Sequence, residues 1–273
     1  MAVNPRVLLL GGHGKVSLHL TPLLLQRSWD VISVIRDSSQ IDEIKALGKG
    51  KPGKVDVLLS SLDDVKSDSD AEAIVEKAKP DYVVWSAGAG GKGGASRTNA
   101  VDRDACKHII NATLNKPQIK KFLMVSHIGS RRRQAPWMSK EKWDKIDHVN
   151  REVLPTYYAA KLEADEYFLA MTKKRLENDK DFQAILLRPG MLTLEKPSGK
   201  VELGKTKAGG QVSREQVAIV ADKLLARDDT RGWIDLIDGE TPIDEAIDRV
   251  VKDKVDAVDG EDVEAVYKRF SVL

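Results

Sequence analysis

Short apolar segments alternate with longer segments of helical periodicity along this chain, and no other feature constrains its fold more. The apolar segments are residues 7–10, 31–35, 55–59, 82–85, 122–125, 184–187 and 233–237. An apolar run without polar alternation is typical of a strand that is buried on both faces. Because strand and helix follow each other repeatedly, the pattern predicts an α/β fold with a doubly wound parallel sheet and helices on both faces.

The length and composition indicate how this fold is organised. The 273 residues fit a single large α/β domain, and 41% of them are hydrophobic, which is enough for a sizeable core. The sequence shows no internal repeat and no low-complexity tract. We therefore predict one domain over residues 1–273, with an inserted loop region at about 127–155 and a small substrate-side region at about 189–212.

Charge and the length of the apolar runs argue against several classes of protein. Lys and Arg number 44 and Asp and Glu 42, so the net charge of +2 disfavours a protein that coats nucleic acid or an anionic membrane. The apolar runs are short, as in Val7–Leu10, whereas a membrane-spanning helix needs about 20 such residues. The N-terminus does not resemble a secretory signal, and the single Cys106 cannot form an intrachain disulfide, so we expect a cytoplasmic location.

A glycine-rich loop follows the first apolar segment. It reads GGHGKVS over residues 11–17 and leads directly into a helical pattern. Gly11 and Gly14 allow a sharp turn, and the N-terminus of the next helix offers N–H groups and a positive dipole to a pyrophosphate. Such turns also occur without a ligand, but the position at the start of a doubly wound chain favours a phosphate-binding loop.

The residues after the second apolar segment indicate which dinucleotide would bind. An acidic residue at this place holds the ribose 2′-hydroxyl, whereas an arginine accepts a 2′-phosphate. Arg36 comes first and Asp37 second, so we predict NADP as the cofactor, with NAD as the alternative that Asp37 leaves open. The other interpretation of Arg36 is a solvated surface charge.

Tyr157 and Lys161 lie four residues apart in a segment of helical periodicity, so they share one helix face. An ammonium near a phenol favours the phenolate and lowers the pKa of the tyrosine. Such a tyrosine can exchange a proton with a substrate while a nicotinamide moves a hydride, and the lysine can bond the nicotinamide ribose. By itself, a Tyr-x-x-x-Lys pattern is more often structural than catalytic.

Six segments together carry a family resemblance. They are GGHGKVS (11–17), VIRDSSQ (34–40), WSAGAGGKGG (85–94), FLMVSHIGS (122–130), YYAAKLEAD (157–165) and LLRPGMLT (186–193). In this order, and over almost the whole chain, they resemble an atypical short-chain dehydrogenase/reductase of the NAD(P)H-binding, NAD-dependent epimerase/dehydratase-like kind. The resemblance implies a Rossmann-like fold.

The resemblance also implies where the cofactor and substrate bind. The cofactor-binding residues are expected to be Gly11, His13, Gly14, Lys15, Val16, Arg36, Ala87, Gly88, Lys161, Pro189 and Gly190. For His13, a steric role or simple exposure is the alternative interpretation. Tyr157 would be the catalytic acid/base, and Lys161 would activate it.

One departure from the family pattern bears directly on catalysis. The usual catalytic serine is the second of a Ser-Ser pair after the fifth strand, but this chain has Ser126-His127. Either Ser126 or Ser130 replaces it, or His127 polarises a carbonyl itself, because a neutral imidazole can donate a hydrogen bond to an oxyanion. The alternative interpretation of His127 is an ordinary loop residue.

Two further departures concern the adenine and the substrate. No acidic residue directly follows the third strand, so we predict that Ser61 hydrogen-bonds the base. The insertion 131–154 lies where a substrate lid would be. Its Arg131–Arg133 run with Trp137 and Trp143 has the composition of a nucleic-acid patch, but the acidic residues that follow favour a lid or a partner surface, and an ordinary solvated loop is the simplest interpretation. We expect no metal site, because the histidines lack partners at ligand spacing.

These observations lead to one leading hypothesis and two alternatives. The leading hypothesis is an NADP(H)-dependent oxidoreductase that acts on a small carbonyl or alcohol compound, with Ser126 or His127 as the carbonyl polariser. The alternatives are a non-catalytic NAD(P)(H)-binding sensor or regulatory protein, and an NAD(P)-dependent epimerase or dehydratase. We expect a small-molecule substrate of open identity, no nucleic-acid or membrane partner, and either a monomer or a homodimer.

Overall fold

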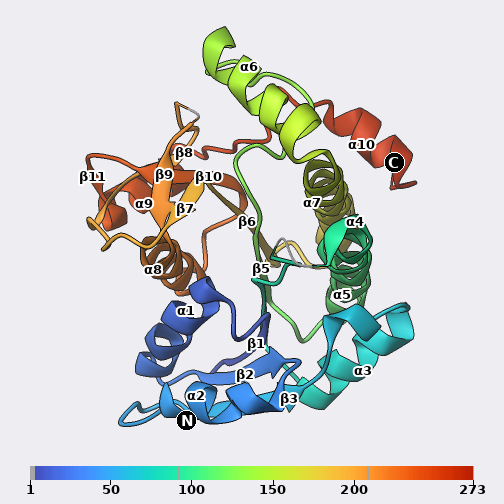
Figure 1. Ribbon diagram of the computed structural model, residues 1–273, viewed down its shortest axis with the longest axis vertical. Helices are drawn as coiled ribbons and strands as arrows, with labels where there is room; N and C mark the ends of the chain where they lie inside the picture. Colours follow the sequence, from blue (N-terminus) through green and yellow to red (C-terminus); the bar gives the residue numbers. More distant parts are fainter. Residues whose placement is uncertain (1–3, 91–92, 208, 273) are drawn as a thin grey trace.

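The computed structural model describes residues 4–90, 93–207 and 209–272. In these residues the chain forms a nine-stranded sheet with the order β11-β8-β10-β6-β5-β4-β1-β2-β3 (Figure 1). Its strands are β1 (Arg6–Leu10), β2 (Asp30–Ile35), β3 (Val55–Leu59), β4 (Tyr82–Trp85), β5 (Lys121–Val125), β6 (Gln183–Pro189), β8 (Lys200–Gly204), β10 (Gly232–Asp238) and β11 (Thr241–Pro242). The strands from β3 to β10 in this order run parallel, whereas β8 pairs antiparallel with both β10 and β11.

Each apolar segment that we expected to be a strand lies within this sheet, which confirms the doubly wound α/β fold. The central strand β1 shows why these runs lack polar alternation. Val7 and Leu9 contribute to the core on one face and Leu8 and Leu10 to the core on the other, because successive side chains point to opposite sides. The strand order reverses at β1, which has β2 on one side and β4 on the other, so a crevice opens there at the carboxyl ends of the strands.

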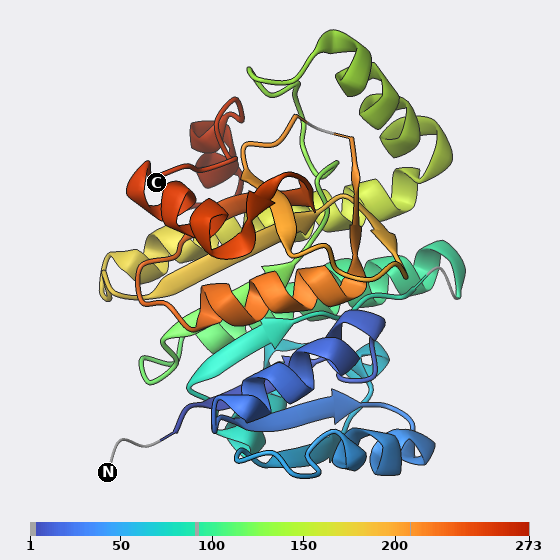
Figure 2. The same ribbon diagram turned by 90° about the vertical axis from the view of Figure 1, so that its left-hand side faces the viewer.

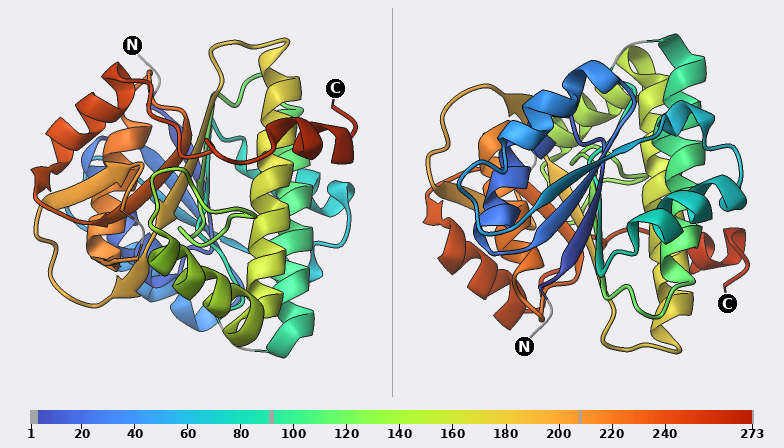
Figure 3. Two further views of the ribbon diagram at one scale, coloured as in Figure 1. Left: turned by 90° about the horizontal axis from the view of Figure 1, so that it is seen from above. Right: turned by 90° about the horizontal axis from the view of Figure 1, so that it is seen from below.

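Helices cover both faces of the sheet (Figures 2 and 3). One face carries α1 (Lys15–Gln26), α8 (Arg214–Leu225) and α9 (Ile243–Lys252), and the other carries α3 (Asp68–Ala78), α5 (Cys106–Leu114) and α7 (Pro155–Leu176). The shorter helices are η1 (Ser38–Gln40), α2 (Ile41–Ala46), η2 (Leu62–Asp64), α4 (Gly94–Thr98), η3 (Asn99–Ala105), α6 (Lys140–His148), η4 (Val149–Val153) and α10 (Val263–Arg269).

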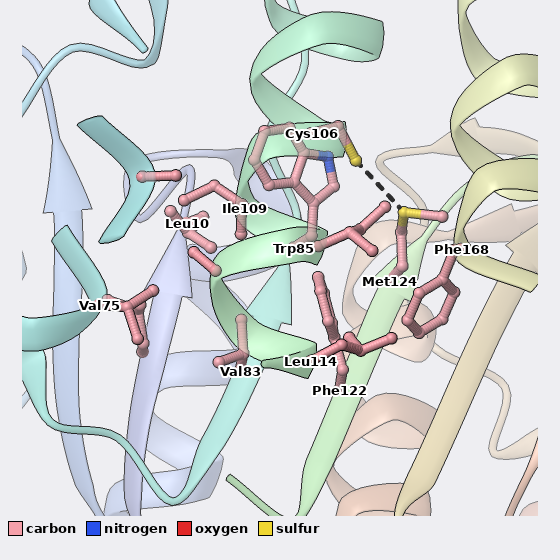
Figure 4. Close-up of a cluster of buried hydrophobic side chains, with 14 of the residues drawn as sticks. Leu10, Val75, Val83, Trp85, Cys106, Ile109, Leu114, Phe122, Met124 and Phe168 are labelled. Atoms are coloured by element: carbon pink, nitrogen blue, oxygen red, sulfur yellow. Dashed lines mark hydrogen bonds between the residues drawn. The ribbon is translucent and has the colours of Figure 1, made fainter. Parts of the chain in front are cut away.

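The core under α5 and α7 contains the chain's cysteine. Cys106 is fully buried beside Trp85, and its Sγ lies 3.5 Å from the Sδ of Met124 (Figure 4). Burial raises the pKa of the Cys106 thiol well above its ordinary value. The thiol therefore stays protonated and acts as a packing group.

The two regions outside the regular alternation are more ordered than the sequence indicates. The inserted region at about 127–155 contains α6 and the π-helix η4, so it is not a plain loop. Residues 189–212 contain β8 and a separate two-stranded parallel sheet of β7 (Met191–Thr193) and β9 (Gln211–Ser213). Within the described ranges, no helix is long and apolar enough to cross a bilayer, and no cluster of three or more His, Cys, Asp or Glu could hold a metal.

Candidate functional site

The glycine loop makes a sharp turn between β1 and α1. Gly11 has a φ of +82°, and a Cβ at this position would lie 2.7 Å from the Cα of Ala87. A Cβ at Gly12 would collide with the hydroxyl of Ser33. Gly14 precedes α1 and offers no side-chain cap to it. The first N–H groups of α1 are thus left to a ligand, which suits an anion at the helix N-terminus.

A cavity of about 290 Å³ lies beside this loop at the carboxyl ends of β1 to β4. It is lined by most of the residues that we predicted for the adenosine and phosphate side of the cofactor, namely Gly11, His13, Gly14, Arg36, Ala87 and Gly88. It is also lined by residues that the sequence did not single out, among them Gln40, Ser60, Asp63, Ser86, Ala89, Arg97 and Val101. The structure therefore places these predicted residues together.

Three of the residues predicted for the adenosine and phosphate side, Lys15, Val16 and Ser61, do not line this cavity. The side chain of Lys15 is exposed on the first turn of α1, and that of Val16 packs into the core. Ser61 was expected to bond the adenine, but its Oγ caps η2 by accepting from the amide of Asp63 at 3.3 Å. Because neither side chain of Lys15 and Val16 lines the cavity, these two residues can contact a phosphate only through the backbone N–H groups of the first helical turn.

A carboxylate that we considered missing is present in the cavity. The short helix η2 brings Asp63 there, where Arg97 donates from Nε to Oδ1 at 2.6 Å and from Nη2 to Oδ2 at 3.1 Å. The hydrogen bonds from Arg97 hold the pKa of Asp63 below its ordinary value. Ser61 followed two residues later by Asp63 is a helix-capping pattern, and this signal could have revealed the turn.

Arg36 and Asp37 differ in their surroundings. Arg36 lines the cavity with a half-exposed side chain, and its Nη1 lies 3.4 Å from Oδ2 of Asp63. The carboxylate of Asp37 turns away and accepts hydrogen bonds from the backbone N and the Oγ of Ser39, at 2.9 Å and 2.7 Å. Asp37 is therefore already engaged in a local turn, whereas Arg36 faces the cavity.

A second group of residues meets at the carboxyl end of β5. The rings of His127 and Tyr157 lie 5.2 Å apart between centroids and are tilted by 37°. Lys161 follows on the same face of α7, is 2% exposed, and donates from Nζ to the carbonyl of Val125 at 3.3 Å. Tyr157, Lys161 and His127 are thus brought together as the sequence predicted.

The pKa of Tyr157 differs from our expectation. We expected Lys161 to lower it, and Lys161 does act in that direction. Burial acts more strongly, so the pKa of Tyr157 is raised above its ordinary value. The phenol is therefore protonated at neutral pH and can donate its proton.

Lys161 keeps its charge despite its burial. Desolvation lowers its pKa, but Tyr157 and the carboxylates of Asp165 and Asp102 outweigh that effect and raise the pKa above the ordinary value. Asp102 also accepts from the amide of Ala89 at 2.8 Å, beside the first cavity. The sequence analysis missed both carboxylates, because nothing local marks them as neighbours of a lysine.

Ser126 and Ser130 lie in the segment after β5, where the family's catalytic serine is expected. Ser126 is buried, and its Oγ donates to Oδ2 of Asp165 on α7 at 2.6 Å. Ser130 is fully buried. The hydroxyl of Ser126 is thus committed to a carboxylate, whereas for Ser130 and His127 the role of carbonyl polariser stays a prediction.

His127 has one engaged and one unengaged ring nitrogen. Its Nδ1 accepts from the amide of Gly129 at 3.1 Å, which places the ring proton on Nε2. Within the part of the chain that the structure describes, Nε2 is buried and has no hydrogen-bond partner. Burial, together with the charges of Lys161 and Arg188, lowers the pKa of His127 to about 3. The ring is consequently neutral, and its Nε2 can donate a hydrogen bond to a ligand.

Arg188 on β6 holds the loop that carries His127. Its Nη2 donates to the carbonyls of Ile128 at 3.0 Å and Ser130 at 3.1 Å. Its Nε lies 3.4 Å from Oδ1 of Asp235 on β10, and both side chains are fully buried. Burial raises the pKa of Asp235 to about 6. No local sequence pattern predicts these contacts of Arg188 with the loop and with Asp235.

A second cavity, of about 370 Å³, lies beside His127. It is lined by His127, Ile128, Gly129, Lys142, Lys145, Ile146, Val149, Asn150, Met191, Gly209 and Gly210. These residues come from the loop after β5, from the inserted region and from the segment 189–212. Both regions that we assigned to the substrate side thus contribute to one cavity.

Pro189 and Gly190 line neither cavity. The carbonyl of Pro189 accepts from the amide of Ile128 at 3.0 Å, and the amide of Gly190 donates to the carbonyl of Leu236 at 2.9 Å. A Cβ at Gly190 would collide with the backbone of Gly210. These residues set the path of the chain from β6 to β7, and a direct contact with a cofactor stays a prediction.

The Arg131–Arg133 run is engaged within the chain. Arg131 is fully buried, donates to the carbonyls of Ala257 and of Asp259, the latter at 2.6 Å, and lies over the ring of Trp137. Arg132 donates from Nε to Oε1 of Glu166 at 2.5 Å. The run therefore ties the insertion to α7 and to the C-terminal segment.

A glycine-cradled cavity at the reversal point of a doubly wound sheet, with a Tyr-Lys pair on a following helix, defines a dinucleotide-binding α/β protein. The comparison of sequences gives the family. The model of the NAD(P)H-binding family matches residues 11–228, and the chain belongs to this family. Its fold is that of an NAD(P)H-binding oxidoreductase or epimerase.

Individual relatives agree with this assignment. The chain is 32% identical over 241 residues to UPF0659 protein C216.03 of Schizosaccharomyces pombe, covering 87% of this chain and 91% of the relative. It is 28% identical over 248 residues to the "Uncharacterized sugar epimerase YhfK" of Bacillus subtilis, covering 90% and 100%. The crystal structure of the oxidoreductase ylbE from Lactococcus lactis superposes with a TM-score of 0.68 at 20% identity, covering 90% of this chain and 97% of that one.

Proposed function

We propose that this protein is an NADP(H)-dependent oxidoreductase that acts on a small carbonyl or alcohol compound. The observation that carries the proposal is the meeting of the Tyr157 phenol, the buried ammonium of Lys161 and the unpartnered Nε2 of His127. A phenol can exchange a proton, an ammonium can stabilise a phenolate, and an N–H can stabilise charge on a substrate oxygen.

The residues around the first cavity fit a dinucleotide. A Cβ at Gly11 or Gly12 would fill the cradle, and the uncapped N-terminus of α1 suits a pyrophosphate. Asp63 offers carboxylate oxygens to the adenine side. Arg36 faces the same cavity while Asp37 is bound to Ser39, and this difference supports NADP over NAD.

Side chains of the protein would transfer the proton and stabilise charge on the substrate oxygen. A bound nicotinamide supplies or accepts the hydride. In the direction of reduction, Tyr157 gives its hydroxyl proton to the substrate oxygen, and Lys161 stabilises the phenolate that remains. His127 donates from Nε2 to the same oxygen as negative charge develops on it. Ser126 takes no part, because its hydroxyl is bound to Asp165.

The test is to replace Tyr157 with Phe, which removes the proton donor and retains a ring beside His127. We expect NADPH oxidation with a panel of aldehydes and ketones to fall about 100-fold or more. In calorimetric titrations, the Kd for NADPH is expected to stay within about twofold of wild type, and wild type is expected to bind NADPH more tightly than NADH. Undiminished turnover in Y157F would refute the proton-transfer step. No binding of either nucleotide would refute the whole proposal.

An NAD(P)-dependent epimerase or dehydratase is the second candidate. The 28% identity to a protein named a sugar epimerase, over the full length of that relative, favours it. Such an enzyme restores its cofactor in every cycle, so it would purify with tightly held nucleotide and consume no NADPH. The apolar side chains of Ile128, Ile146, Val149 and Met191 in the wall of the second cavity favour the oxidoreductase. Absorbance of the purified protein, followed by NADPH consumption with the carbonyl panel, separates the two.

A further inference from the structure

The second cavity points to a substrate class, and this inference rests on the proposed function. We propose that the substrate is a carbonyl compound with an apolar body and a carboxylate, and that Lys142 binds the carboxylate. The carbonyl lies at His127 and Tyr157, and the apolar body occupies the cavity between the inserted region and β7.

The cavity combines one polariser, two cations and an apolar wall. Its volume of about 370 Å³ lies within the usual range for a small-molecule site. His127 lines it together with Lys142 and Lys145, and the remaining side chains of any length are Ile128, Ile146, Val149, Asn150 and Met191. Within the described residues, no Asp or Glu lines this cavity. An anion bound here would meet Lys142 and Lys145, of which Lys145 already pairs with Glu141.

Lys142 differs from the other basic side chains of its helix. Lys140 pairs with Asp144 at 2.6 Å, and Lys145 pairs with Glu141 at 2.8 Å. In the part of the chain that the structure describes, Lys142 makes no ion pair, although its side chain is partly buried against the cavity. Its ammonium is therefore available for a charge-assisted hydrogen bond to an anionic ligand.

Exposed apolar side chains occur in the two segments that contribute to the second cavity. Six large hydrophobic side chains are highly exposed in the described ranges, and all except Leu59 come from these segments. These five are Val149, Val153, Leu154, Met191 and Leu194. Of the five, Val149 and Met191 line the cavity itself, and exposed apolar side chains in the wall of a cavity favour a ligand with an apolar body.

The test compares an acid with its own ester, using the full-length protein. The substrates are 4-carboxybenzaldehyde and methyl 4-formylbenzoate, which differ in charge but share the aldehyde and the ring. We expect wild type to prefer the acid in kcat/KM. Lys142→Gln is expected to lower kcat/KM for the acid about tenfold or more, as loss of a charge-assisted bond implies, and to change that for the ester by less than about twofold. Lys140→Gln is the matched control on the same helix, since its ammonium is paired with Asp144 and does not line the cavity.

A binding measurement keeps this inference separate from the catalytic proposal. Calorimetry with 4-methylbenzoate and 4-methylbenzamide, on protein saturated with NADP⁺, requires no turnover. If wild type binds the benzoate selectively, and if K142Q loses this binding while K140Q retains it, the inference is supported. This holds even if neither aldehyde is reduced, because the absence of reduction would refute only the proposed function. If wild type reduces both aldehydes, and if K142Q lowers kcat/KM equally for both or for neither, the inference is wrong and the proposed function is unaffected.

Discussion

The imidazole of His127 is neutral because its surroundings oppose a positive charge. Burial is the largest cause, and the nearby charges of Lys161 and Arg188 act in the same direction, so the pKa of His127 falls to about 3. With Nδ1 accepting from Gly129, the ring can donate only from Nε2. It can therefore do what a serine hydroxyl does toward a carbonyl oxygen, namely donate one hydrogen bond, without changing its charge at working pH.

This protonation state predicts a pH dependence of stability. In the unfolded chain, His127 binds a proton below about pH 6.5, whereas the native ring does so only below about pH 3. Between these values the unfolded state binds more protons, so this contribution to stability is present above about pH 6.5 and is lost as the pH falls. We expect the Tm of wild type to drop more between pH 7 and pH 5 than the Tm of His127→Gln, measured by circular dichroism. Equal drops would show that the ring is not held neutral.

At the scale of elements, the loop after β5 depends on β6 and β10. Arg188 on β6 binds two carbonyls of that loop and pairs with Asp235 on β10. The ring of Trp233 adds a cation–π contact 4.4 Å from the guanidinium. Three neighbouring parts of the fold thus fix the backbone of His127, and this backbone sets the direction of Nε2.

Removing the guanidinium is expected to destabilise the fold. Arg188→Met leaves Asp235 buried without its cation and two carbonyls without a donor, so we expect a loss of about 3–5 kcal/mol in urea unfolding. The double variant Arg188→Met/Asp235→Leu should recover part of that loss, because no buried charge is left unpaired. Arg133→Met is the control, since its exposed pair with Asp262 is expected to contribute less than about 1 kcal/mol. A loss at Arg188 no larger than at Arg133 would argue against the clamp.

At the scale of the whole molecule, the C-terminal segment fastens the inserted region to α7. Arg131 from the insertion binds the carbonyls of Ala257 and Asp259, and Arg269 on α10 pairs with Glu166, as Arg132 does. The C-terminal segment therefore supports the inserted region, which forms part of the wall of the second cavity, although the two segments are far apart in the sequence.

Deleting residues 258–273 tests this dependence. The deletion removes the Asp259 carbonyl and Glu261 from the buried guanidinium of Arg131, and it leaves Glu166 with Arg132 as its remaining partner. We expect a loss of about 3 kcal/mol or more in the free energy of unfolding, because the buried charge of Arg131 loses its carboxylate. Differential scanning calorimetry and limited proteolysis are the measurements, and new cleavage is expected in the segment 131–154. The Arg133→Gln variant is the control. An unchanged Tm with the insertion still protected would contradict the role of the C-terminal segment.

The sequence by itself determined the features that depend on neighbouring residues. The apolar runs predicted the strands because both faces of the sheet are covered, and the glycine loop and the Tyr157–Lys161 pair followed from turn geometry and helical period. Only the tertiary structure decided which donors and acceptors meet across the chain. Ser126 bonds to Asp165 39 positions away, and Arg131 bonds to Ala257 126 positions away. Asp63, rather than Ser61, lines the first cavity. No local pattern encodes such contacts, because burial brings the groups together only after the sheet and helices have packed.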